Sequence, residues 1–175
     1  MLASCAIGAV PSRASDFEVV SVGVRARLAE KRVLGKEQPE SFHAYDVVTA
    51  IRPPWDEQWR DDWGVGARLL ASVGVLEDAN KTALLASLIP VLTAGTQDGR
   101  FSFEFGAGFA LLSRPRFRDQ DYGGALQLAL TAGVSVSLSS RIGLGYRFQH
   151  YSDGGAYGSN TIGADLHMIE LTYRF

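Results

Sequence analysis

The sequence lacks several features that mark common classes of protein. Its 175 residues include one cysteine, Cys5, so an internal disulfide and a metal site built on several thiolates are both excluded. It has no excess of positive charge, because 17 basic residues stand against 19 acidic ones, and no polycationic surface for nucleic acid is expected. No apolar run reaches the ~18 residues that a membrane-spanning helix requires.

The mean hydropathy of +0.02 and the apolar content of 46% are those of an ordinary soluble protein. These values do not exclude a membrane barrel, because each barrel strand carries its apolar residues on one face only. The length suits one domain with one core. Residues 1–15 form a short apolar run without a basic start, and we interpret them as the remnant of a secretory signal in front of a single folded domain at residues 16–175.

Alternation with a period of two residues, rich in Val, Phe, Tyr and Gly, recurs through the chain after residue 15, while helix signals are scarce. About eight such runs can be counted, each long enough for a barrel strand. They lie near residues 18–28, 42–53, 63–75, 83–95, 100–112, 122–138, 141–152 and 164–175.

Most of these runs separate into an apolar face and a polar face. In residues 126–138, leucines and valines share one parity, while Gln127, Thr131 and Ser135 share the other. Such a separation fits a closed barrel with lipid outside and a polar lumen. The run at 83–95 breaks the pattern, because it is apolar on both faces. The parity predicts that Leu128, Val134, Leu144 and Leu171 face lipid and that Arg68, Glu104, Arg147 and Glu170 face the lumen.

Parity alone does not say which face is inside, and a soluble lipocalin-like carrier would turn its apolar face inward. The C-terminus favours the membrane orientation, since Ile169, Leu171, Tyr173 and Phe175 alternate up to a final aromatic residue, as in the assembly signal of bacterial outer-membrane barrels. Tight links at residues 96–99 and 139–140, set against longer polar links near 29–41, 113–121 and 153–163, agree with this orientation. The sequence therefore predicts an all-β, eight-stranded antiparallel transmembrane β-barrel in the outer membrane of a Gram-negative bacterium.

In each of the last two runs, the row of apolar residues that faces outward gives way to polar residues, and in both runs this happens at the same end of the barrel. His150 and Ser152 follow one apolar stripe, and Asp165 and His167 precede the other. Asp165 lies ten residues before Phe175, and since ~9–11 residues cross a bilayer, it should lie at the outer-leaflet boundary. Serine, histidine and a carboxylate are the parts of a Ser-His-acid ester hydrolase. We expect the His150 ring within hydrogen-bond reach of both Ser152 and Asp165, and an anchoring or supporting role for His167.

These residues carry a resemblance to a known family. The segments at 146–152, 163–165 and 171–175 resemble the PagL-type lipid A 3-O-deacylases, over about the last 35 residues. The resemblance implies an outer-membrane carboxylic ester hydrolase that removes the ester-linked 3-O-acyl chain of lipid A, or lipopolysaccharide, without metal or other cofactor. It implies that His150 is the base, Ser152 the nucleophile and Asp165 the acid. A homodimer is compatible with it.

The sequence departs from the family pattern at two positions. The family's best-described member has Glu where Asp165 stands, which predicts that Asp165→Glu retains or raises activity if the longer acid fits. The family commonly has Asn directly after the serine, and this chain has Asp153. Because an ionised carboxylate donates no hydrogen bond, an oxyanion would depend on backbone N–H groups such as that of Gly154.

Three arginines in the third outer link have two interpretations. Arg114, Arg116 and Arg118 either grip the phosphates of lipid A, for which bidentate guanidinium groups are suited, or are solvated loop charges. The alternative to an esterase is a non-catalytic small barrel that serves adhesion or membrane integrity, in which the His, Ser and Asp cluster has no chemical role.

Overall fold

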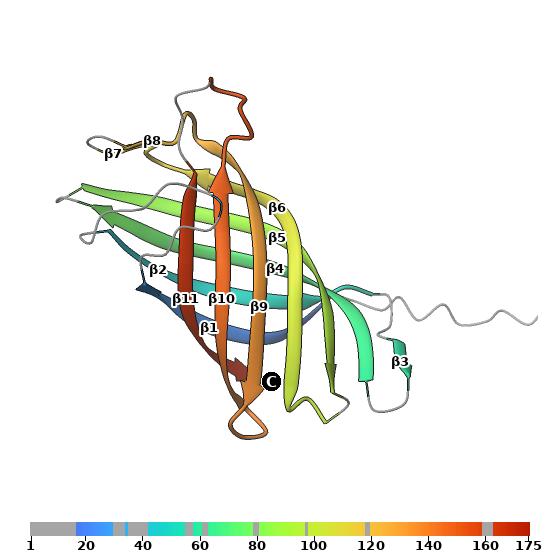
Figure 1. The fold of residues 1–175 in the computed structure, drawn as a ribbon. Helices are drawn as coiled ribbons and strands as arrows, with labels where there is room; N and C mark the ends of the chain where they lie inside the picture. Colours follow the sequence, from blue (N-terminus) through green and yellow to red (C-terminus); the bar gives the residue numbers. More distant parts are fainter. Residues whose placement is uncertain are drawn as a thin grey trace, which may run out of the picture.

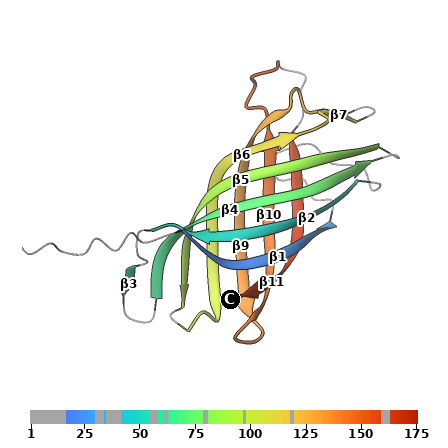
Figure 2. The ribbon, with the colours of Figure 1, turned by 180° about the vertical axis from the view of Figure 1, so that it is seen from behind.

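Eight long strands, each antiparallel to its neighbours, close on themselves in the computed structural model, so the predicted β-barrel is present (Figure 1). The barrel strands are β1 (Glu18–Ala29), β2 (His43–Arg52), β4 (Trp63–Asp78), β5 (Lys81–Thr96), β6 (Phe101–Leu112), β9 (Leu126–Ser137), β10 (Ile142–Ser152) and β11 (Ala164–Arg174). The sheet closes because β2 pairs with β1 on one side and with β4 on the other. Figure 2 shows the wall of β1, β2, β4 and β5 from behind.

Three short strands lie outside the barrel wall. β3 (Gln58–Arg60) pairs with the start of β4, and β7 (Arg116–Phe117) pairs with β8 (Gln120–Asp121). No described segment is a helix long and apolar enough to cross a membrane. The expected signal remnant at residues 1–15 lies outside the described residues. The structure describes residues 17–29, 34, 42–54, 58–60, 63–78, 81–96, 98–117, 120–158 and 163–175.

The outer wall of the barrel is apolar, as the parity predicts. The side chains of Leu128, Val134 and Leu171 are between 39% and 48% exposed, and Leu144 is partly exposed on the same face. Leu144 also lines an apolar depression on the outer wall together with valines of β1, β2 and β4. The apolar face is therefore turned outward, which is the orientation of a membrane barrel and the reverse of a lipocalin-like carrier.

The lower half of the lumen, at the end that holds the C-terminus, contains the predicted charges. The Arg147 guanidinium donates to Glu170 Oε2 at 2.7 Å and to Glu104 Oε2 at 2.5 Å. Arg25 and Asp46 form a second buried pair through two hydrogen bonds of 2.5 and 2.9 Å. Below these pairs lies a polar cavity of about 310 Å³. Opposite charges thus satisfy one another inside the barrel, as a filled small barrel requires.

The Arg147 ion pairs give a direct test of what holds the lumen together. Arg147→Ala leaves the part-buried Glu104 without its ion pair and leaves Glu170 with only a longer 3.9 Å contact to Arg25, so the free energy of unfolding should fall by about 3–5 kcal/mol. Urea titration of the protein in detergent or lipid measures this change. Arg116→Ala is the matched control: it removes an exposed ion pair with Asp121, and its effect should stay within about 1 kcal/mol. Equal effects of the two variants would contradict a supporting role for the lumen charges.

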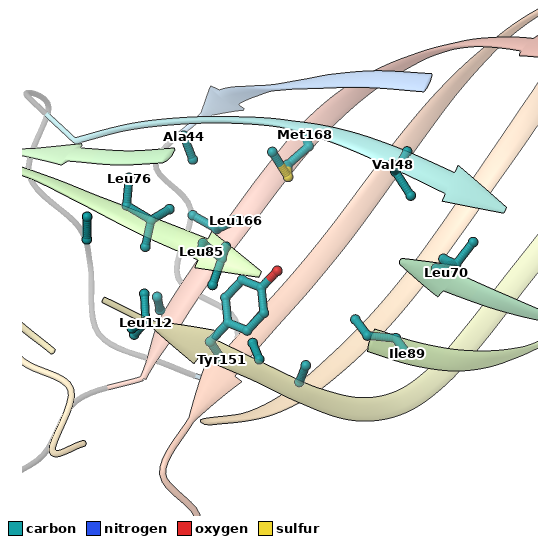
Figure 3. Close-up of a cluster of buried hydrophobic side chains, with 14 of the residues drawn as sticks. Ala44, Val48, Leu70, Leu76, Leu85, Ile89, Leu112, Tyr151, Leu166 and Met168 are labelled. Atoms are coloured by element: carbon teal, nitrogen blue, oxygen red, sulfur yellow. The ribbon is translucent and has the colours of Figure 1, made fainter. Parts of the chain in front are cut away.

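The upper half of the lumen is lined mostly by apolar side chains, with Gln127 and Gln149 also buried there, so the expectation of a polar interior holds only in part. Leu85 and Ile89 of β5 point inward into a buried cluster that surrounds Tyr151 and Met168 (Figure 3). The outward side of β5 is also apolar, and Leu84 is well exposed there. The two apolar faces of residues 83–95 therefore have separate causes, because one faces the membrane and the other seals the upper lumen.

The links between strands have the lengths that the sequence indicates, with one exception. The tight turns at residues 96–99 and 139–140 lie at the lower end, and the longer links at 113–125 and 153–163 lie at the upper end. The exception is the upper link between β4 and β5, which is short because Asp78 and Lys81 are paired.

In the tight turn at residues 96–99, hydrogen bonds from Thr96 Oγ1 and the Arg100 N–H hold the pKa of the Asp98 carboxyl below its usual value.

Candidate active site

The predicted site residues lie where β10 and β11 reach the upper end of the barrel. The two strands are antiparallel neighbours, and their register puts His150 directly opposite Asp165. Both side chains belong to the outward parity, yet His150 is 8% and Asp165 3% exposed. They are therefore shielded, which corrects the expectation of an open position on the lipid face. Ser152, one outward position further along β10, stays partly exposed.

The imidazole of His150 and the carboxylate of Asp165 form a hydrogen-bonded pair. His150 Nδ1 lies 2.7 Å from Asp165 Oδ1. With the ring proton on Nδ1, that nitrogen donates to the carboxylate and Nε2 keeps its lone pair. Among the described residues, His150 Nε2 has no hydrogen-bond partner. The arrangement therefore offers an oriented base whose accepting nitrogen is available.

The second expected contact is absent, because no hydrogen bond joins His150 and Ser152, both of which are described in the structure. The serine nevertheless lies two residues along the same strand and on the same outward parity. Its neighbour across the sheet is Leu128 of β9, an exposed apolar side chain. A serine hydroxyl rotates freely, and hydrogen bonds in unliganded sites are often long and shorten when substrate binds.

Two features next to the pair could not be identified from residue type. The backbone N–H of Leu34, in the first outer link, donates to Asp165 Oδ2 at 2.7 Å. Gly163, directly before β11, packs against the His150 ring so closely that a Cβ there would lie 2.7 Å from His150 Cε1. The first is a main-chain contact across 131 residues and leaves no trace in the sequence. The second has a weak signal, a glycine immediately before a strand.

The segment that follows Ser152 is a turn organised by Asp153. Its carboxylate accepts hydrogen bonds from the backbone N–H of Gly155 at 3.0 Å and of Tyr157 at 3.1 Å. Gly154 adopts a positive φ of 61°, which favours glycine. The Gly154 N–H has no acceptor among the described residues. Asp153 thus shapes the turn by accepting hydrogen bonds, and the backbone N–H of Gly154 remains available as a donor.

The arginines of the third outer link lie at the same end of the barrel but do not join the His150 pair. Arg116 forms an exposed ion pair with Asp121 at 2.9 Å within the β7–β8 hairpin. Arg114 is exposed, and Arg118 lies outside the described residues. His167 lies one outward position below Asp165, and its Nδ1 is 2.5 Å from the Tyr146 hydroxyl. This contact agrees with a supporting place for His167 beside the site.

The described residues contain no group of three or more His, Cys, Asp or Glu side chains that could hold a metal ion. Within the described part of the site, the groups able to do chemistry are therefore an imidazole, a carboxylate, a hydroxyl and backbone N–H donors. These are the groups of acyl transfer by a nucleophile, a base, an orienting acid and an oxyanion donor.

Comparison with known proteins gives one family and one strong structural likeness. A sequence model of the family described as lipid A 3-O-deacylase (PagL) matches residues 43–174, well over half of the chain. The crystal structure of the outer membrane enzyme PagL is similar, with a TM-score of 0.70 and 19% sequence identity, over 89% of this chain and 99% of that one. The Yersinia pestis outer membrane protein Ail, in a phospholipid bilayer nanodisc, has a TM-score of 0.44 and 17% identity, over 90% of this chain and 100% of that one. No curated protein matches the sequence.

Proposed function

Since the chain belongs to the lipid A 3-O-deacylase (PagL) family and is an outer-membrane β-barrel, we propose that it hydrolyses the ester that links the 3-O-acyl chain to lipid A. The observation that carries the proposal is the His150–Asp165 hydrogen bond of 2.7 Å, formed beside Ser152 at the upper rim of an apolar outer wall. An ester of lipid A lies at that level, between its headgroup and its acyl chains. Exposed Leu128 and Leu130 offer apolar surface next to the site.

The proposed reaction proceeds through an acyl-enzyme. Ser152 Oγ attacks the ester carbonyl carbon while His150 Nε2 takes the hydroxyl proton, and Asp165 stabilises the imidazolium that forms. The tetrahedral intermediate collapses as the C–O bond to the sugar breaks, and His150 returns the proton to the leaving sugar oxygen. A water molecule then attacks the Ser152 ester by the same steps, releasing the fatty acid and the free serine.

The negative oxygen of the tetrahedral intermediate needs hydrogen-bond donors. We assign this task to backbone N–H groups of the turn after Ser152, with Gly154 as the candidate donor. Asp153 holds the turn by accepting from Gly155 and Tyr157, so its carboxylate does not need to act as a donor. A backbone donor aimed at a developing oxyanion is worth roughly 10²–10³ in rate in comparable sites.

Of the three arginines proposed to hold lipid A phosphates, Arg114 remains the best candidate. It is exposed at the upper end of the barrel and makes no hydrogen bond or ion pair with any other described residue. Arg116 already pairs with Asp121. A phosphate contact would raise affinity for substrate without changing the chemical step, so Arg114→Ala should raise KM and leave kcat near the wild-type value.

The proposed function can be tested by analysing the lipid A of cells that express the protein. Expression in the outer membrane of a bacterium whose lipid A carries a 3-O-linked acyl chain should give lipid A lighter by that one chain, as detected by mass spectrometry. Unchanged lipid A in cells that hold the folded protein in their outer membrane would contradict the proposal. That outcome would favour the non-catalytic barrel.

The close packing of Gly163 against His150 gives a further expected result. Gly163→Ala places a Cβ 2.7 Å from His150 Cε1 and 3.3 Å from Nε2, so the ring has to move. A displacement of about 1 Å at a catalytic group can cost about 10²-fold in rate, and kcat should fall by this order. Gly155→Ala is the control: its Cβ would meet nothing within 4 Å, and its positive φ of 83° adds a backbone strain that Gly163→Ala does not carry. A loss in Gly155→Ala as large as that in Gly163→Ala would mean that activity is sensitive to any substitution in this outer link, and the result would contradict a specific effect on the His150 ring.

A further inference from the structure

The carboxylate of Asp165 is held from two directions by groups that are far apart in the sequence. Oδ1 faces His150 Nδ1 at 2.7 Å, and Oδ2 accepts from the Leu34 N–H at 2.7 Å. The first contact crosses the β10–β11 hairpin, whereas the second comes from the first outer link. The chain leaves β1 at Ala29, which is paired with His167, so this link begins one outward position below Asp165.

The contact with Leu34 belongs to its main chain and not to its side chain. The Leu34 side chain is 60% exposed, and it contributes little burial to the site. The N–H is a fixed donor that every residue except proline provides. A hydrogen bond to a charged carboxylate is stronger than one between neutral groups, and this one lies where Asp165 is 3% exposed.

An aspartate in this place has a freedom that the second hydrogen bond removes. Its carboxyl group can rotate about the Cβ–Cγ bond, because terminal torsions of this kind have broad minima. Rotation would take Oδ1 out of line with His150 Nδ1. A donor that fixes Oδ2 leaves one orientation, in which Oδ1 points at the imidazole.

We infer that the main-chain N–H of Leu34 is a positioning group for the reaction, holding Asp165 by Oδ2 so that Oδ1 stays on His150. This inference rests on the proposed function, because it concerns the acid of the proposed triad. It makes the main chain at Leu34 part of the active site. The consequence is that the orientation of Asp165 depends on where the main chain at residue 34 is held.

The kinetic test compares two substitutions at one position in the full-length protein, assembled in detergent or lipid. Leu34→Pro removes the N–H, while Leu34→Ala keeps it and removes the side chain. Loss of a hydrogen bond to a charged group corresponds to a loss of about 10- to 100-fold, which should appear in kcat for the proline variant. KM should stay close to the wild-type value, because the Leu34 N–H contacts Asp165 and not the substrate. The alanine variant should keep both the kcat and the KM of the wild type.

A second measurement is independent of catalysis and of whether the proline variant assembles. Hydrogen exchange of the Leu34 amide should be faster in Asp165→Ala than in the wild type, and it should stay slow in His150→Ala, where the acceptor is retained. Equal exchange in Asp165→Ala and wild type would overturn the inference, as would a wild-type kcat in an assembled proline variant. If the wild type itself fails to deacylate lipid A, the proposed function fails, and the exchange result still decides whether Leu34 holds Asp165.

Discussion

Ser152→Ala is expected to abolish nearly all turnover of lipid A while leaving the barrel intact. The serine supplies the nucleophile, and losing the nucleophile of a Ser-His-acid site removes the covalent route altogether. From comparable sites, kcat should fall by at least about 10⁴-fold. His150→Ala should cost about as much, because these two residues act as a unit in the first proton transfer. The measurement is kcat on purified lipid A with protein of verified assembly.

Assembly should survive the Ser152 substitution, because the side chain is outward and partly exposed and supplies nothing to the lumen. Ser139→Ala is the matched control. Ser139 lies in a tight turn at the opposite end of the barrel, where its hydroxyl accepts from Arg141 and Ile142. Activity close to wild type is expected for this control. Undiminished deacylation by Ser152→Ala would mean that the nucleophile is another residue.

Asp165→Asn is expected to give the second largest loss, smaller than that of the serine. The amide can present its NH₂ group to His150 Nδ1, which favours the tautomer with the proton on Nε2, where it cannot accept from serine. Losses of about 10²–10⁴-fold in kcat/KM are expected, since the base remains present but poorly oriented. Asp98→Asn is the control, an exposed carboxylate in the lower turn. If Asp165→Asn were as active as Asp98→Asn, Asp165 would not be the acid of the site.

The structure also changes the expectation for Asp165→Glu. Both oxygens of Asp165 already lie 2.7 Å from donors, His150 Nδ1 and the Leu34 N–H. One additional methylene would push the carboxylate past these donors in a position that is almost fully buried. We therefore expect a partial loss and not a gain, measured as kcat/KM on the same substrate. A gain would show that the backbone at this position adjusts to the longer acid.

The sequence predicts the barrel wall well, because lipid on one side imposes a strict period of two on each strand. The predicted run at 141–152 corresponds to β10 at Ile142–Ser152, and the run at 18–28 to β1 at Glu18–Ala29. The run predicted at 122–138 begins too early, since β9 starts at Leu126. The cause is a turn at Gly123, whose φ of 84° is positive.

Only those features of the site that follow from residue type and from the alternation of faces along a strand could be predicted. Alternation puts His150, Ser152 and Asp165 on one face at one end, and the strand register brings the first and third together. The shielding of the pair could not be predicted, because it depends on tertiary contacts outside the strand pattern, such as the packing of Gly163 against the His150 ring. The Leu34 contact is of the same kind, since a main-chain N–H is common to nearly every residue and has no sequence signature.

Covalent labelling tests the central claim, that Ser152 is the nucleophile of an outer-membrane esterase, most directly. A long-chain alkyl fluorophosphonate reacts with an activated serine, because Oγ forms a bond to phosphorus and fluoride leaves. Peptide mass spectrometry of the assembled protein should find the adduct on Ser152, and labelling should fall sharply in His150→Ala, whose serine lacks its base. An adduct on a different residue, or no adduct on Ser152 in protein that deacylates lipid A, would contradict the account.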